Sequence, residues 1–299
     1  MSVAPFRLKP WFSERPWGRR DLRPWYADTG TKELVGEAWL TGPQCVVETG
    51  QLAGRTLGSV GAELGGEFPL LVKLLFPAEK LSVQVHPDDA QARALGETRG
   101  KTECWYVLEA EPGAAVALGL KDGVDAATVR AAVADGASGN MESLLKWVPV
   151  SVGDMLFVDA GTVHAIGPGV VLLETQQTSD VTYRLYDYGR PRELHLEKGL
   201  QVLKAKTAAG KIPPTRMDGF MRLIEQKYFV VDRFDVASSE VRVAMDGVGC
   251  LVCLSGDGVV RGDGVEVEFK VGQAVVAPTG EVSVVSNSGI SFMRCVAPA

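Results

Sequence analysis

Short apolar segments, separated by glycine and proline, recur along most of the 299-residue chain. Most of these segments are rich in β-branched residues, and after residue 211 apolar and polar positions alternate strongly. This pattern is typical of short β-strands joined by turns, in a barrel or a sandwich. The strands that it predicts most clearly cover residues 34–40, 44–48, 69–76, 81–86, 103–109, 113–119, 155–159 and 170–176. The chain is therefore expected to be mainly β.

A helical periodicity replaces the alternation between Asp125 and Lys146. Its apolar residues recur three or four positions apart, namely Ala126, Val129, Ala132 and Val133. This spacing predicts helices inserted around residues 125–147. Shorter helices are expected within 88–99 and within 192–205.

The chain is long enough for two modules, because single hydrophobic cores stop growing at about 250–300 residues. A hinge-like segment lies at 211–215, and residues 272–280 weakly repeat residues 152–161. We therefore expect one barrel with the helical insertion in residues 1–210 and a smaller, similar barrel in residues 211–299. No histidine follows His195, so the second barrel is expected to be metal-free and structural.

Composition and charge exclude several functional classes. The chain is 46% hydrophobic and 23% charged, as in ordinary globular proteins rather than disordered ones. Its net charge of −6 opposes binding to nucleic acid. No apolar run approaches the roughly 20 residues needed to span a bilayer, and the five cysteines are scattered. These features predict a cytoplasmic protein that binds neither membranes nor nucleic acid.

Two short stretches, 81–89 and 100–104, carry a possible metal site. Alternation along a strand would project Gln84 and His86 to one side, and Lys101 and Glu103 to one side of a second strand. His164, in a glycine-flanked turn, supplies a second imidazole. Nitrogen and oxygen ligands of this kind suit a divalent metal. The alternative is an ordinary row of outward-facing polar residues on an alternating strand.

The same stretches resemble a known family. The run from Lys80 to Asp89 (KLSVQVHPDD) resembles a segment of the type I mannose-6-phosphate isomerases, which are zinc enzymes of the cupin superfamily. Further segments match that family in chain order, namely 35–39, 68–73, 100–103, 161–164 and 174–184. The resemblance implies a cupin fold, a double-stranded β-helix or jelly roll, and one zinc ion per chain.

The resemblance also implies roles for single residues. The zinc ligands would be Gln84, His86, Glu103 and His164. Ser82 and Lys73 would hold the substrate phosphate. The residues around the reacting carbons would be Lys101, Glu174, Asp180 and Arg184. Arg190 is a further candidate for a local positive pocket in this acidic protein. Lys73 interrupts the apolar stretch 68–76, where a lysine is costly unless it has a partner. Some family members have a histidine where this chain has Gly100. If that histidine assists ring opening in those members, this chain must use water or another group.

The activity that the resemblance implies is the interconversion of mannose 6-phosphate and fructose 6-phosphate through an enediol. Glu174 is the first candidate for the base and Lys101 the second, although Glu174 could instead be a structural partner of Lys101 or Arg184. Two other classes stay open: a metal-dependent cupin oxygenase and a non-catalytic cupin that binds sugar phosphates. The same ligands could hold manganese or cobalt instead of zinc. The protein is expected to be a monomer or a weak homodimer.

Overall fold

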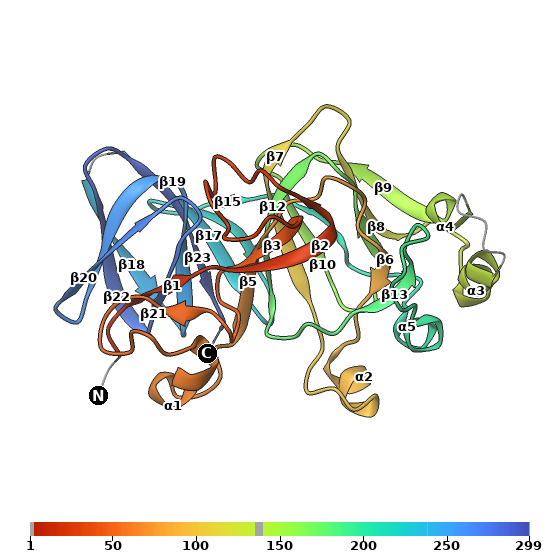
Figure 1. Ribbon diagram of the computed structural model, residues 1–299, viewed down its shortest axis with the longest axis horizontal. Coiled ribbons are helices and arrows are strands. Elements are labelled where there is room, and N and C mark those ends of the chain that lie inside the picture. The colour runs from red at the N-terminus through yellow and green to blue at the C-terminus, as the bar shows by residue number, and fades with distance from the viewer. Residues whose placement is uncertain (1–2, 135–139, 238, 299) are drawn as a thin grey trace. The chain divides into compact units, whose positions relative to one another are not determined.

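The computed structural model describes residues 3–134, 140–237 and 239–298, in which β-strands predominate over a few short helices (Figure 1). The chain divides into two compact units. The terminal unit holds the described residues of Met1–Arg15, Arg20–Leu74 and Pro213–Ala299. The central unit holds those of Pro16–Arg19 and Leu75–Ile212. None of the helices in these ranges is long and apolar enough to span a membrane.

In the central unit, two β-sheets enclose a core. The strands are β6 (Val83–Val85), β7 (Glu103–Ala110), β8 (Ala115–Leu120), β9 (Leu145–Pro149), β10 (Met155–Val158), β11 (His164–Ile166), β12 (Val170–Gln177), β13 (Tyr183–Tyr186) and β14 (Gly210–Ile212). Within this unit, one sheet contains the run β14-β10-β7-β12, which is part of a seven-stranded sheet, and the other has the order β13-β6-β11-β8-β9. Trp105 and Leu172 from the first sheet pack with Val116, Leu118 and Ile166 from the second. The apolar side chains that alternate along these strands therefore form the barrel interior.

Helices cover the outer face of the five-stranded sheet. They are α2 (Asp89–Ala94), α3 (Ala126–Ala134), α4 (Asn140–Ser143) and α5 (Leu196–Val202). Val83 and Val85 of β6 pack in one apolar cluster with Val129 of α3 and Val202 of α5. Because Val83 and Val85 face outward, alternation turns Gln84 toward the interior. The outer helices thus fix which face of β6 can carry a site.

The terminal unit is a second assembly of β-sheets. Its strands are β1 (Phe6–Lys9), β3 (Val35–Trp39), β4 (Val46–Val47), β15 (Thr215–Arg216), β16 (Met221–Glu225), β17 (Val230–Val236), β18 (Ser239–Met245), β19 (Gly249–Gly262), β20 (Val265–Lys270), β21 (Ala274–Ala277), β22 (Gly280–Ser286) and β23 (Ile290–Val296). Its short helices are η1 (Leu57–Val60) and α1 (Gly61–Leu64). Strands β2 (Trp11–Arg19) and β5 (Leu70–Leu75) contribute residues to both units.

All eight strands predicted from the sequence are present, with ends that differ by one or two residues. The helical insertion is confirmed but shorter than expected, because Leu145–Pro149 form β9 and pair with β8. Residues 135–139 of the expected insertion lie outside the described residues. The helices expected within 88–99 and 192–205 are α2 and α5.

The boundaries of the two units differ from the single boundary expected at residue 210. Strand β1 pairs with β21, so Phe6 lies opposite Val276. Because the N-terminal strands are bonded to C-terminal ones, most of residues 1–74 fall in the terminal unit. The weak internal repeat is matched by β10 and β21, each of which follows a turn containing a glycine with positive φ, Gly153 and Gly272. Whether residues 1–210 act as one catalytic domain stays a prediction.

Candidate metal centre

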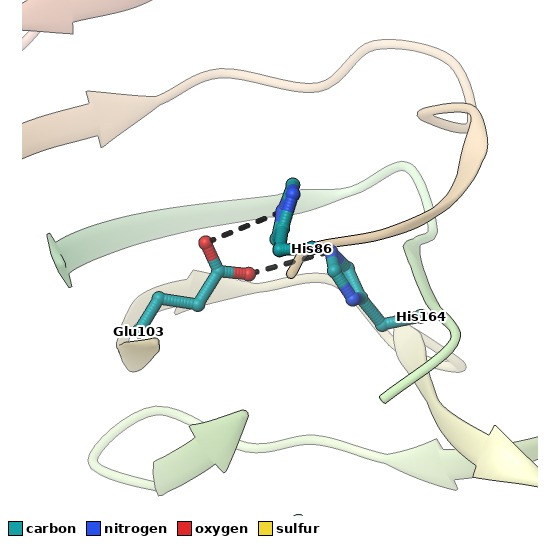
Figure 2. Close-up of side chains that lie close together, drawn as sticks. All are labelled: His86, Glu103 and His164. Carbon is teal, nitrogen blue, oxygen red and sulfur yellow. Dashed lines mark ion pairs between the residues drawn. The ribbon is translucent and has the colours of Figure 1, made fainter. Parts of the chain in front are cut away.

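Three strands of the central unit bring His86, Glu103 and His164 together. His86 directly follows β6, Glu103 begins β7 and His164 begins β11. Strands β6 and β11 are antiparallel neighbours, with His164 opposite Gln84. The exposed fractions are 2% for His86, 0% for Glu103 and 1% for His164. Figure 2 shows the two imidazoles pointing toward the carboxylate from different elements.

The donor atoms of these three residues surround one point. His164 Nε2 lies 3.3 Å from Glu103 Oε1, and His86 Nε2 lies 3.7 Å from Glu103 Oε2 (Figure 2). One ligand atom from each residue lies within 4.8 Å of the others, so a single ion could be bound by all three. Two imidazoles and a carboxylate are a common protein ligand set for divalent transition metals.

The protonation state of His164 also suits a metal ligand. Burial lowers the pKa of this imidazole to about 4, so the ring is neutral at pH 7. Its Nδ1 lies 2.9 Å from the backbone oxygen of Thr162. A carbonyl oxygen only accepts, so Nδ1 carries the hydrogen and Nε2 presents its lone pair toward Glu103. A lone pair facing a carboxylate favours a cation between them.

Gln84 lies at the centre with its amide nitrogen facing His164. Its Nε2 is 3.2 Å from His164 Nε2, and its Oε1 accepts a hydrogen bond of 3.0 Å from Ser82 Oγ. Coordination of a metal through Oε1 would require the amide to rotate by about half a turn, which exchanges donor and acceptor. Gln84 as a fourth ligand, and Ser82 as a phosphate contact, stay predictions.

Two of the expected catalytic residues lie beside the metal set. Lys101 is 4% exposed, and its Nζ lies 3.3 Å from Glu103 Oε2. Glu174 is also 4% exposed and accepts a hydrogen bond of 3.1 Å from Trp105 Nε1. Glu174 lies opposite Trp105, two positions from Glu103, so both acids share one face of the β7–β12 ladder. The fold therefore places a second buried carboxylate near the possible metal ligands.

The remaining predicted residues lie in less enclosed positions. Arg184 of β13 is opposite Gln84 in register, and its Nη1 donates to the backbone oxygen of Glu193. Asp180 is exposed in the segment after β12. Arg190 lies beside Asp187, with 3.6 Å between Nε and Oδ1, and its guanidinium also bonds the backbone oxygen of Lys80. Substrate contacts by these three residues stay predictions.

Lys73 belongs to the terminal unit. It is 2% exposed, and its Nζ lies 4.6 Å from the ring centroid of Trp39. The sequence argument required a partner for this buried cation, and the indole face supplies part of one. The role of Lys73 in phosphate binding stays a prediction.

Trp105 and Thr162 contribute to the centre but were not predicted from the sequence. Trp105 orients Glu174 and contacts the ring of His164, with 5.5 Å between centroids. Alternation from Glu103 could have placed Trp105 on the site face. No sequence signal indicates that the carbonyl of Thr162 fixes the His164 tautomer, because this contact depends on the turn geometry.

Gly100 lies close to the backbone of the segment that follows His86. A Cβ at Gly100 would lie 2.5 Å from the backbone carbon of Asp88 and 2.6 Å from the oxygen of Pro87. Because both are backbone atoms, no side chain fits without moving the segment that follows His86. Glycine at position 100 therefore allows the close approach of this segment to residues 87–89.

Comparisons with known proteins identify the family of this chain. The family description "Phosphomannose isomerase type I, catalytic domain" matches residues 44–120, which include three of the four predicted metal ligands. The chain is 34% identical over 304 residues to mannose-6-phosphate isomerase ManA of Bacillus subtilis, covering 94% of this chain and 95% of that protein. The chain belongs to the type I mannose-6-phosphate isomerase family.

Solved structures of mannose-6-phosphate isomerases share the fold. The crystal structure of the enzyme from Bacillus subtilis superimposes with a TM-score of 0.86 at 29% identity, covering 98% of this chain and 99% of that one. A zinc-bound mannose 6-phosphate isomerase structure has a TM-score of 0.77 at 18% identity, with coverage of 99% and 100%. The expected fold class, a mainly β protein with a cupin barrel, a helical insertion and a second, smaller cupin-like β-barrel, is confirmed.

Proposed function

We propose that this family member interconverts mannose 6-phosphate and fructose 6-phosphate with one zinc ion per chain. The observation that carries the proposal is the buried cluster of His86, Glu103 and His164, with ligand atoms within 4.8 Å of one another. The proposed substrate and the reaction correspond to the name of the 34% identical relative from Bacillus subtilis. The zinc-bound relative supports the choice of metal, since the fold is the same.

The residues present fit a zinc ion. His164 offers a neutral Nε2, Glu103 a carboxylate and His86 a second imidazole, and we assign Gln84 Oε1 as the fourth donor. Zinc sites that keep an exchangeable position typically have three protein ligands, and rotation of the Gln84 amide would decide between three and four. When bound, zinc would act as a Lewis acid toward a sugar oxygen.

Glu174 is the proposed base that moves the proton between C1 and C2. Its Oε1 is held by the Trp105 indole N–H, so we assign the proton transfer to the other carboxylate oxygen. Trp105 thereby fixes the carboxylate rotamer, which is the geometric requirement for a general base. Lys101 is the second candidate, since its Nζ is buried beside Glu103.

Cationic and polar side chains would bind the rest of the substrate. Arg184 would stabilise charge on the reacting oxygens with its fixed fork of N–H donors, and Asp180 would lie near the same carbons. Ser82, Lys73 and Arg190 are the proposed phosphate contacts. We keep as parts of this proposal a cytoplasmic location, a monomer or weak homodimer, and a metal-free segment 211–299.

The decisive experiment is a coupled assay for conversion of mannose 6-phosphate to fructose 6-phosphate. The purified protein is assayed as isolated, after treatment with chelator, and after zinc is added back, with the metal content measured each time. We expect activity that is lost with zinc and returns with it. Substrate binding without turnover in the zinc-loaded protein would contradict the proposal and indicate a sugar-phosphate-binding cupin. Bound iron with substrate-dependent oxygen uptake would indicate an oxygenase.

A further inference from the structure

Lys101 lies in the short segment 100–102, which precedes strand β7 and is outside its ladder, whereas Glu103 is the first paired residue of that strand. Strand β7 begins only at Glu103, so the backbone of residues 100–102 needs partners from elsewhere. The N–H of Lys101 donates to the backbone oxygen of Pro87 at 3.0 Å. The N–H groups of Gly100 and Thr102 instead donate to two side chains, those of Asp89 and Gln177.

These two side chains form a closed chain of hydrogen bonds around the segment. Asp89 Oδ1 accepts from the Gly100 N–H at 2.9 Å and from Gln177 Nε2 at 3.0 Å. Gln177 Oε1 accepts from the Thr102 N–H at 3.0 Å. Gln177 is 6% exposed, so water competes little for these bonds. Lys101 thus lies between the N–H groups of Gly100 and Thr102. The bonded side chains of Asp89 and Gln177 fix the positions of both groups.

Both ends of the Gln177 amide have partners that allow only one orientation. An N–H of the main chain can bond only the amide oxygen, and a carboxylate can bond only the amide nitrogen. The Gln177 N–H also donates to the oxygen of Thr102, which joins the end of β12 to the same segment. A Cβ at position 100 would meet the backbone of residues 87–89, so this segment lies directly against the turn that leads into α2.

We propose that Asp89 and Gln177 are positioning residues that hold Lys101 and Glu103 in their working geometry. This inference rests on the proposed isomerase function. Lys101 Nζ lies 3.3 Å from Glu103 Oε2, and a shift of the 100–102 segment would change that distance directly. A displacement of about 1 Å caused by a residue away from the chemistry can cost about 100-fold in rate.

The test compares four single variants with the wild-type protein at saturating zinc. Gln177→Ala and Asp89→Ala are expected to lower kcat about 10- to 100-fold, as loss of outer-shell partners typically does, with KM changed less than about twofold. Asp89→Asn should recover most of kcat, because its amide oxygen can still accept both hydrogen bonds. Gln91→Ala is the matched control. Gln91 accepts from the Asp88 N–H in the same turn but has no bond to residues 100–102.

A double variant sharpens the test. If Asp89 and Gln177 act as one unit, their effects are not additive. The kcat of the double variant Asp89→Ala/Gln177→Ala should then be at most about twofold lower than that of the worse single variant. Losses that multiply, kcat within about twofold of wild type in both alanine variants, or an equal loss in Gln91→Ala would each overturn the inference. Thermal melting temperatures of all variants show whether Gln91→Ala matches the others in stability.

A second readout separates this inference from the proposed function. Zinc affinity, measured by competition with a chromophoric chelator, is expected to fall about tenfold in Gln177→Ala and Asp89→Ala and to stay near wild type in Gln91→Ala. If the wild-type protein does not isomerise mannose 6-phosphate, the proposed function is rejected. The zinc affinities alone then test whether Asp89 and Gln177 are positioning residues. Unchanged zinc affinity in that case would overturn it.

Discussion

The two units each bury a carboxylate inside β-structure but neutralise it differently. In the terminal unit, Asp232 of β17 is 0% exposed and is bonded by two guanidinium groups. Arg222 Nε lies 2.6 Å from its Oδ1, and Arg294 Nη2 donates to its Oδ2. In the central unit, Glu103 faces two imidazoles and the ammonium of Lys101. One carboxylate therefore has two permanent cations, and the other has one cation and two groups that can lose their charge.

The choice of neighbours decides what each carboxylate can do. Guanidinium groups stay protonated at any physiological pH, so the Asp232 network is complete within the protein. Burial lowers the pKa of His164 to about 4, so this neighbour of Glu103 is neutral at pH 7. A neutral imidazole supplies a lone pair instead of a charge. The Asp232 network accordingly suits a structural role, and the Glu103 cluster suits a metal.

Glu103→Gln is expected to have the largest effect, and it tests whether the Glu103 cluster binds a metal. The change keeps the size of the side chain but removes its charge, so zinc affinity should fall more than about 100-fold, beyond the loss typical of an outer-shell partner. Isomerase activity should be lost at ordinary zinc concentrations. Metal content after gel filtration and the coupled assay measure both. A fully zinc-loaded, active variant would break the comparison.

Glu174→Gln should show that proton transfer depends on a different residue from those that bind the metal. We expect kcat to fall about 100- to 10,000-fold, the range typical for loss of a general base, while zinc stays bound. The amide can still accept the Trp105 N–H, which makes the variant a close structural match. Zinc content and kcat are measured on the same preparation. Near-normal turnover would show that Glu174 is a structural partner of its neighbours.

Asp232→Ala tests the other side of the comparison. It would leave the buried guanidinium of Arg294 with only the exposed carboxylate of Asp246, at 3.4 Å. Breaking a buried ion pair in this way typically costs about 3–5 kcal/mol of unfolding free energy. Zinc content of the folded protein should not change. The control is Asp235→Ala in the same strand, since the side chain of Asp235 is 56% exposed and pairs with Arg233. For that exposed pair we expect about 0–1 kcal/mol.

Urea unfolding followed by fluorescence and circular dichroism compares the two aspartate variants. A loss of stability for Asp232→Ala no greater than that for Asp235→Ala would contradict a structural role for the Asp232 network. Loss of zinc by the folded Asp232→Ala variant would show that the two carboxylates are not separate in function.

Trp105→Phe is expected to have the smallest effect. Phenylalanine keeps an aromatic ring near His164 but lacks the N–H that bonds Glu174. A hydrogen bond to a charged group is typically worth about 1.5–3 kcal/mol, so kcat should fall about 10- to 100-fold at most. Zinc affinity should change little. If kcat stays within about twofold, the Trp105 bond does not orient the base.

Local sequence patterns predicted much of the fold and of the centre. Gln84 is flanked by the apolar residues Val83 and Val85, so the alternation along β6 places its side chain on the opposite face of the strand from theirs. With three histidines in the chain, His86 and His164 were two of few choices for nitrogen ligands. Helix α3 was predicted from its spacing, but β9 was missed because its pairing with β8 outweighs local preference.

What the sequence by itself determined is the set of elements and the residue types at the centre, because strand alternation and ligand chemistry are local properties. Tertiary structure alone decided that Gln84 lies opposite His164, that a side chain at position 100 would meet the backbone of Pro87, and that Gln177 bonds Asp89. It also paired β1 with β21 and so divided the chain at places other than residue 210. These contacts depend on which strands and turns come together in the folded chain, and the residue pattern of one segment does not specify its partner.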